Sequence, residues 1–369
     1  MSKPSSVALY LHQSYNIPLN ISSLIDLPLE AAALAYRPVT DFRNILFDHG
    51  ILNIKKLKRP VISVGNMTVG GSGKTPLVHF LSNELNLRGL KSVVLSRGYR
   101  PGKPAIQKPC IVDPLNLEAS NLYGDEAVLL ARSSASKVIV CHNRYLSGRV
   151  GEDQLNPSLF ILDDGFQHRS LFRDCDILVI DSSKDIEQRL FPRGVLREAW
   201  RGIRRADIIV LSKANLTTQK RLEKWKEFIA KFNKSAPVVE MNYGFTEPQK
   251  VTLGSLKGER VFVVAAIADP ESLSRMLLNL GTNVVGHKLF RDHYMFTRED
   301  VVRCEEDSRR RKAHFIITTE KDGVRLRGID KKMEWVELPL KTEIDANALF
   351  STIQRKGIPC DLKLSEFST

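Results

Sequence analysis

The residues best suited to chemistry begin with the glycine-rich stretch Thr68 to Thr75, which reads TVGGSGKT. Its second half matches the phosphate-binding motif G-x-x-x-x-G-K-[ST], but threonine stands where this motif has its first glycine. Threonine fits there if the chain is extended, because an extended residue needs no positive φ. Backbone N–H groups of such a loop bind phosphate oxygens, and the N-terminus of the following helix strengthens the attraction. The sequence therefore predicts a nucleotide site.

Two side chains of this loop have predicted tasks of their own. Lys74 is expected to reach the β- and γ-phosphates, and Thr75 is expected to offer its hydroxyl to Mg²⁺. The residues predicted to contact the nucleotide are Thr68, Val69, Gly70, Gly71, Ser72, Gly73, Lys74 and Thr75.

An acidic pair, Asp163 and Asp164, follows the apolar run 159–162. P-loop enzymes hold their metal ion with a carboxylate near the phosphates, and the end of a neighbouring strand is a suitable place for it. An ordinary turn after a strand would also accept aspartate. The presence of the glycine-rich loop favours the metal-binding interpretation.

Short apolar segments rich in β-branched residues alternate with helical patterns through most of the chain. Strands of this type indicate a parallel sheet covered by helices on both faces. We therefore predict an α/β fold with a P-loop NTPase-type sheet and a smaller C-terminal α/β domain. The predicted strands are 60–65, 92–96, 137–141, 159–162, 176–180, 207–211, 260–266, 314–318 and 335–338, and the predicted helices include 77–87, 127–132 and 218–232. The predicted divisions are N-terminal helices over 1–56, the P-loop domain over 57–240, a linker over 241–259 and the C-terminal domain over 260–369.

Composition narrows the classes of partner. The chain of 369 residues carries a formal net charge of +13, which favours an anionic partner. Its basic runs lack the interleaved aromatic residues of a single-strand-binding platform, so we expect no nucleic-acid partner. No segment reaches the roughly 18 apolar residues of a membrane span, and no signal peptide is visible. The five cysteines form no C-x-x-C pair and are interpreted as reduced thiols without a zinc site.

The region 20–50 is apolar in a broken pattern, and Val39, Phe42 and Ile45 recur at helical spacing. Amphipathic helices here have two interpretations. They pack against the main domain, or they lie in a membrane interface.

Further polar motifs follow the predicted strands or lie in the loops between them. In chain order they are N-x-T-V-G-G-S-G-K-T-P at 66–76, S-R-G-Y at 96–99, G-D-E at 124–126, D-D-G-F-Q-H at 163–168, G-x-L-R-E at 194–198, D-H-Y at 292–294 and T-T-E-K-D at 318–322. Together they resemble the tetraacyldisaccharide 4'-kinase family, the lipid A kinases of Gram-negative bacteria that are also found in plants. D-D-G-F-Q-H is the most specific block, and threonine is the usual residue of this family at the Thr68 position.

The resemblance implies a reaction and its partners. The γ-phosphoryl group of ATP, with Mg²⁺ as cofactor, is transferred to the 4'-hydroxyl of a tetraacylated glucosamine disaccharide 1-phosphate. The enzyme is expected to be a peripheral monomer on an anionic membrane surface. That surface is the cytoplasmic face of the inner membrane in a bacterium, or an organelle membrane in a plant. This favours membrane contact by the N-terminal helices and gives the positive charge two anionic targets.

The resemblance also implies roles for single residues. Asp125 matches a catalytic base, which must lie within hydrogen-bond reach of the sugar hydroxyl, and His293 matches the histidine coupled to it. Arg197 matches a lid arginine suited to the charge of the γ-phosphate. The residues expected around the metal and the phosphates, beside Lys74, are Thr75, Asp163, Asp164, Gln167 and Glu198.

Two other functions stay open at this point. A P-loop kinase of another sugar or metabolite would use the same loop and acidic pair. A regulatory GTPase would too, but the segment Ser212 to Asn215 lacks the aspartate of the guanine-reading motif. The GTPase interpretation also leaves Asp125 and His293 without a task.

Overall fold

The computed structural model describes residues 36–99, 104–116, 118–187, 189–248, 251–292 and 294–360. Two predictions fall on residues outside these ranges. The proposed N-terminal helices are described only from residue 36 onward, where residues 36–48 are helical. His293, the predicted partner of Asp125, also lies outside the described residues.

The larger of two sheets has nine strands in the described part of the chain, in the order β13-β8-β7-β6-β1-β5-β2-β4-β3. All neighbours pair in parallel except the two edge strands β3 and β13, which run antiparallel to β4 and β8. The predicted parallel sheet is therefore confirmed except at its two edges. Its strands are β1 (Val61–Asn66), β2 (Ser92–Ser96), β3 (Cys110–Ile111), β4 (Lys137–Val140), β5 (Leu159–Asp163), β6 (Cys175–Asp181), β7 (Ile208–Ser212), β8 (Val238–Phe245) and β13 (Leu340–Ile344).

Helices cover both faces of this sheet because successive strand residues point to opposite sides. In β1, Ile62 and Val64 pack toward one face, whereas Val61 packs toward the other. The first face is covered by α3 (Lys74–Leu87), α5 (Asp125–Ser133) and α11 (Ala346–Arg355). The second is covered by α6 (Arg144–Leu155), α7 (Gln219–Ala230) and the 3₁₀ helix η2 (Trp200–Arg205). The short helices α4 (Ala119–Tyr123) and η3 (Ala214–Leu216) lie in the connections.

The smaller sheet is parallel throughout, in the order β10-β9-β11-β12. Residues of β9 alternate between a core shared with α8 and a core shared with α9. Its elements are η4 (Gly254–Leu256), β9 (Arg260–Ala265), α8 (Pro270–Leu280), β10 (Asn283–Leu289), α9 (Arg298–Arg310), β11 (Phe315–Thr319), α10 (Glu320–Arg325) and β12 (Trp335–Leu338). We call these elements the small unit, and the nine-stranded sheet with its helices the large unit.

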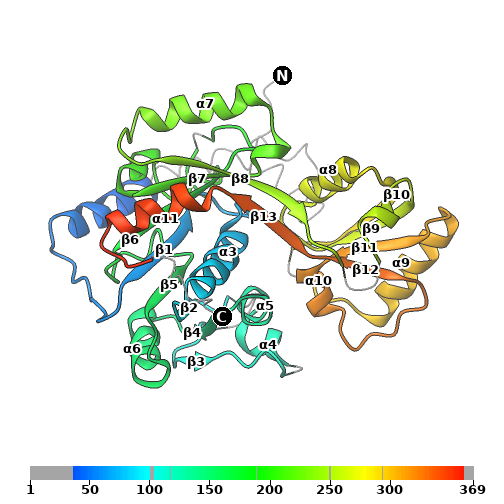
Figure 1. The fold of residues 1–369 in the computed structure, drawn as a ribbon, viewed down its shortest axis with the longest axis horizontal. Coiled ribbons are helices and arrows are strands. Elements are labelled where there is room, and N and C mark those ends of the chain that lie inside the picture. The colour runs from blue at the N-terminus through cyan, green and yellow to red at the C-terminus, as the bar shows by residue number, and fades with distance from the viewer. Residues whose placement is uncertain are drawn as a thin grey trace, which may run out of the picture.

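The chain returns from the small unit to the large one near its C-terminus. Figure 1 shows β13 running back to pair with β8, and α11 follows on the large sheet. The segment 241–259, predicted as a linker, begins inside strand β8, so its first residues belong to the large sheet. Strand β13 escaped prediction because it alternates half-buried and exposed residues at a sheet edge and carries Lys341 and Glu343. Division of the chain at 241–259 stays a prediction, and any such division must assign β13 and α11 to the large unit.

None of the helices within the described ranges has the length and apolar character needed to cross a bilayer.

The end of β1 lies so close to the loop after β5 that only glycine fits at position 65. A Cβ on Gly65 would stand 2.5 Å from the backbone nitrogen of Phe166. We expect Gly65→Ala to lower the free energy of unfolding by about 1–3 kcal/mol, because backbone must move to admit the methyl group. Chemical denaturation measures this effect. The matched control is Gly244→Ala in β8, where the Cβ would meet nothing within 4 Å and little change is expected. Equal stabilities of the two variants would contradict the prediction.

Candidate active site

The glycine-rich loop joins β1 to α3 at the carboxyl edge of the large sheet. Two of its glycines have positive φ, Gly70 at 105° and Gly73 at 94°. A Cβ on Gly73 would also lie 2.3 Å from the Tyr243 hydroxyl. Helix α3 begins at Lys74 with no side-chain cap and no acidic residue in its first turn. The N-terminal N–H groups and the positive end of the helix dipole are therefore left for an anion.

Thr68 lies in an extended segment, not in a tight turn. It forms an antiparallel bridge with Leu196, and the Val69 N–H donates to the Val195 carbonyl at 2.7 Å. Thr68 is absent from the residues with positive φ. Threonine is therefore unstrained here, and the bridge fastens the loop to the segment that carries Arg197.

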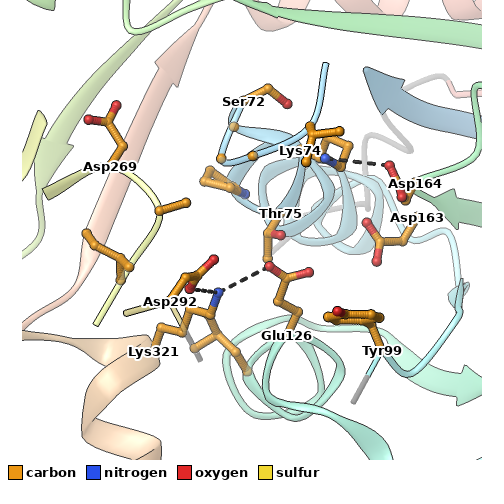
Figure 2. Close-up of a pocket in the computed structure, with 18 of the residues that line it drawn as sticks. Ser72, Lys74, Thr75, Tyr99, Glu126, Asp163, Asp164, Asp269, Asp292 and Lys321 are labelled. Atoms are coloured by element: carbon orange, nitrogen blue, oxygen red, sulfur yellow. Dashed lines mark hydrogen bonds and ion pairs between the residues drawn. The ribbon is translucent and has the colours of Figure 1, made fainter. Parts of the chain in front are cut away.

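Lys74 and Arg197 converge on the second residue of the acidic pair. The Lys74 Nζ lies 3.5 Å from Asp164 Oδ1, and one Arg197 nitrogen contacts the two carboxylate oxygens at 2.9 and 2.8 Å. Burial opposes ionisation of Asp164, but Lys74 and Arg197 outweigh it and lower the pKa of this carboxyl to about 2. Asp164 therefore stays ionised between two cations. Figure 2 shows Lys74 directed toward it.

Asp163, the first residue of the pair, has a pKa that is shifted in the opposite direction. Burial, followed by the nearby carboxylates of Glu126 and Asp164, raises the pKa of Asp163 to about 6. Lys74 and a hydrogen bond from the Ser96 hydroxyl at 3.0 Å act in the other direction but do not compensate. A cation placed here would relieve the repulsion between the carboxylates.

Gln167 and Glu198 belong to one hydrogen-bond network beside the loop. The Gln167 amide donates to Glu198 at 2.9 Å and to the Asn66 carbonyl at 2.8 Å. Both oxygens of Glu198 also accept from Arg205 at 2.9 Å. In this arrangement Glu198 orients Gln167, and its carboxylate is shared with a guanidinium.

The helix over residues 36–48 contributes to the same site, which the sequence analysis did not predict. The Tyr36 hydroxyl donates to the Arg197 carbonyl at 3.1 Å, and the Asn44 amide donates to Glu198 at 3.2 Å. A signal was present, since polar residues at 36, 40, 43 and 44 share one helix face, and all four line the cavity. The helix therefore presents its polar side to the site.

These groups line a cavity of about 1480 Å³ that is shared by the two units. The large unit contributes the loop, the acidic pair and Glu126, and the small unit contributes Asp269, Asp292 and Lys321 (Figure 2). Asp125 does not line the cavity. Its side chain, 8% exposed, receives two hydrogen bonds from Arg325 of the small unit. The structure thus brings Glu126 of the G-D-E motif into the same cavity as the acidic pair and leaves Asp125 buried next to it.

The segment Ser212 to Asn215 has a structural task in this arrangement. The Asn215 amide donates to the Tyr243 carbonyl at 2.7 Å and accepts from its N–H at 2.9 Å. Lys213 pairs with Asp181 at 2.6 Å and with Asp269 of the small unit. These contacts leave Asn215 unsuited to reading a nucleotide base.

The raised pKa of Asp163 predicts a pH-dependent stability effect. Since the folded pKa is about 6 and the usual value is 3.8, ionised Asp163 destabilises the fold as pH rises through this window. We expect Asp163→Asn to be more stable than wild type by about 1–3 kcal/mol at pH 8 without metal, and the difference to shrink toward pH 4. Denaturation in the presence of a chelator at several pH values measures it. A variant less stable than wild type at pH 8 would contradict this electrostatic account.

Comparisons with known proteins place the chain among its relatives. The sequence model for tetraacyldisaccharide-1-P 4'-kinase matches residues 25–357. The tetraacyldisaccharide 4'-kinase of Bdellovibrio bacteriovorus is 36% identical over 307 residues, covering 81% of this chain and 89% of that protein. Its counterpart from Aquifex aeolicus is 36% identical over 303 residues, covering 80% and 88%. A crystal structure of LpxK from Aquifex aeolicus in complex with ATP matches with a TM-score of 0.70 and 33% identity, covering 90% of this chain and 99% of that one. The resemblance carried by the motifs is confirmed, and this chain belongs to the tetraacyldisaccharide-1-P 4'-kinase family.

Proposed function

We propose that this protein transfers the γ-phosphoryl group of ATP to the 4'-hydroxyl of a tetraacylated glucosamine disaccharide 1-phosphate. The observation that carries the proposal is the convergence of three motifs on one cleft. The glycine-rich loop, the acidic pair and Glu126 of the G-D-E motif all line it. Phosphoryl transfer needs this arrangement, because donor phosphates and acceptor hydroxyl must meet in line.

The loop over 68–75 is the proposed phosphate-binding P-loop. Its glycines at positive φ and the uncapped start of α3 supply an electropositive, N–H-rich cradle. Lys74 would exchange its contact with Asp164 for the β- and γ-phosphates. The similar protein from Aquifex aeolicus was solved in complex with ATP, which supports ATP as the donor.

Mg²⁺ is the proposed metal. Among the described residues no group of three or more histidine, cysteine, aspartate or glutamate side chains could hold a metal ion by itself. Mg²⁺ commonly takes one or two carboxylates, with waters and substrate phosphates completing its shell. Asp163, Asp164 and the Thr75 hydroxyl fit this donor set, with Gln167 and Glu198 as supporting neighbours. When bound, the ion would neutralise charge on the β- and γ-phosphates.

The remaining groups have proposed roles in transfer. Asp125 is the proposed acceptor of the 4'-hydroxyl proton, with His293 coupled to it, because a sugar hydroxyl is too weak an acid to react unaided. The family resemblance supports this role, and in the structure Glu126, the next residue, lines the cavity. Arg197 lies beside the loop and is suited to stabilise charge on the transferred group.

Two alternatives fit the contacts less well. A guanine-specific switch protein would need a base-reading side chain, whereas Asn215 is held by the backbone of Tyr243. A kinase of a small soluble sugar gives no task to the apolar outer side of the helix over 36–48. There Val39, Phe42 and Ile45 are 65%, 62% and 45% exposed.

We propose that this outer side lies in an anionic membrane surface. The polar side of the same helix lines the cleft, so a helix held in the interface would keep the cleft near the lipid. Lys55 and Lys56 follow it and add positive charge. The protein would then act as a peripheral enzyme.

The proposed reaction is tested by removing the loop lysine. Lys74→Met should lower kcat about 100-fold or more, because the phosphates lose their charged partner. The assay follows transfer of the γ-phosphoryl group to a tetraacyldisaccharide 1-phosphate. Lys91→Met, which changes an exposed lysine before β2, is the control and should match wild type. Wild-type protein that is folded, binds ATP and phosphorylates no such lipid would refute the proposed function.

The membrane proposal is tested by one substitution on the exposed side of the helix. Phe42→Glu should weaken binding to phosphatidylglycerol vesicles at least about tenfold, because an aromatic ring that would enter the membrane interface is replaced by a charge that the anionic surface repels. Sedimentation with vesicles measures the bound fraction. Leu278→Glu makes the same kind of change at a residue of α8 that is 61% exposed, and it should bind like wild type. If both variants lost vesicle binding equally, the helix over 36–48 would make no specific contact with the membrane, and the proposal would be wrong.

A further inference from the structure

A buried ion cluster joins the two units behind the cleft. Arg325 of α10 contacts Asp125 of α5 at 2.7 Å and Asp322 at 3.0 Å. The side chains of Arg325 and Asp322 are 0% exposed, and that of Asp125 is 8% exposed. Burying charges is costly unless the geometry is good and the polar atoms are satisfied. Such a cluster therefore holds its members in defined positions, and 200 residues of chain separate Asp125 from Arg325.

Contacts within the small unit hold the side chain of Arg325 in place. One terminal nitrogen of Arg325 donates to the Ala266 carbonyl at 3.1 Å and to Asp322 at 3.0 Å. Asp322 in turn accepts from the Ala266 N–H at 3.0 Å and from the Thr319 hydroxyl at 2.9 Å. The guanidinium thus has little rotational freedom and presents its other edge to the large unit.

The contact with Asp125 is directional. The Nε of Arg325 donates at 2.9 Å and a terminal nitrogen donates at 2.7 Å, and both bonds end on Oδ2. Two charge-assisted bonds that converge on Oδ2 fix the position of that oxygen. Because both bonds use one oxygen, the guanidinium leaves Oδ1 to other partners.

The same helix holds the neighbouring carboxylate. Lys321, four residues before Arg325, lies 3.3 Å from both Glu126 and Asp292 (Figure 2). Burial alone would lower the pKa of Lys321, but Glu126 and Asp292 outweigh it and hold the pKa above its usual value. Helix α10 therefore contacts both acidic residues of the G-D-E motif, one through each cation.

We propose that Arg325 is a positioning residue for the proton-accepting carboxylate of Asp125, so that docking of the small unit sets the acceptor side of the reaction. This rests on the proposed role of Asp125. Arg325 acts through Asp125 and touches no reacting atom itself. The P-loop side of the cleft does not depend on it, because Lys74, Asp164 and Arg197 all belong to the large unit.

The test is a kinetic double-mutant cycle of Asp125→Asn and Arg325→Met. Arg325→Met should lower kcat by about 100-fold, within the range for a misplaced general base, with the KM for ATP nearly unchanged. The kcat of Arg325→Lys should lie between those of wild type and Arg325→Met. The lysine ammonium keeps the charge but lacks the two fixed N–H donors that converge on Oδ2. In the double variant the loss should be no greater than in Asp125→Asn alone, since the second change removes a group that acts only through the first.

Two controls separate this role from general damage to the fold. ATP should raise the melting temperature of Arg325→Met as much as that of wild type, which shows an intact nucleotide side. Arg298→Met removes an exposed arginine of the small unit, which pairs with Asp330, and should keep the wild-type kcat.

The outcomes distinguish the possible failures. Inactive wild type would refute the proposed function, and an active Asp125→Asn would refute the role of Asp125. If wild type is active and Asp125→Asn is not, two results overturn the present inference alone. These are an Arg325→Met variant as fast as wild type, and losses that multiply in the double variant.

Discussion

The parallel pairing of β1 with β5 is the constraint on which the cleft depends. Their register places Val64 beside Asp163, so the glycine-rich loop and the acidic pair leave the sheet at the same edge. Gly65 permits the close approach, because any Cβ there would strike Phe166. The contact between Lys74 and Asp164 follows from this pairing. Without it, a cationic loop and two buried carboxylates would have no reason to meet.

The electrostatics of the acidic pair follow from the same geometry. Asp164 meets Lys74 and Arg197, and these cations lower the pKa of its carboxyl to about 2. Asp163 is buried among other acids, and its pKa is raised to about 6. The pKa values of these two adjacent aspartates are thus shifted in opposite directions. A bound cation would stabilise the ionised form of Asp163. This is the kind of stored repulsion that a functional site carries and a purely structural turn does not need.

The rest of the molecule closes the cleft from two directions. The helix over 36–48 turns polar side chains to the site and apolar ones outward, which links the proposed membrane contact to the proposed nucleotide site. The small unit approaches from the other side and is joined to the large unit through buried or partly buried ion pairs at Lys213, Lys321 and Arg325. Such pairs are costly to bury and depend on good geometry. They fit a unit that must dock in one position.

Local patterns in the sequence were enough to predict most of the strands and helices and all of the motifs. All-apolar strands, the glycine-rich loop and the acidic pair were predictable because period, glycine and charge act over a few residues. The family was also identifiable, since its motifs keep their order along the chain. Which of these motifs lie next to one another became clear only from the folded chain. The burial of Asp125 under Arg325, the polar face of the 36–48 helix in the cleft and the return of β13 to β8 all join residues far apart in sequence. No local pattern encodes such contacts, because they depend on the packing of the whole chain.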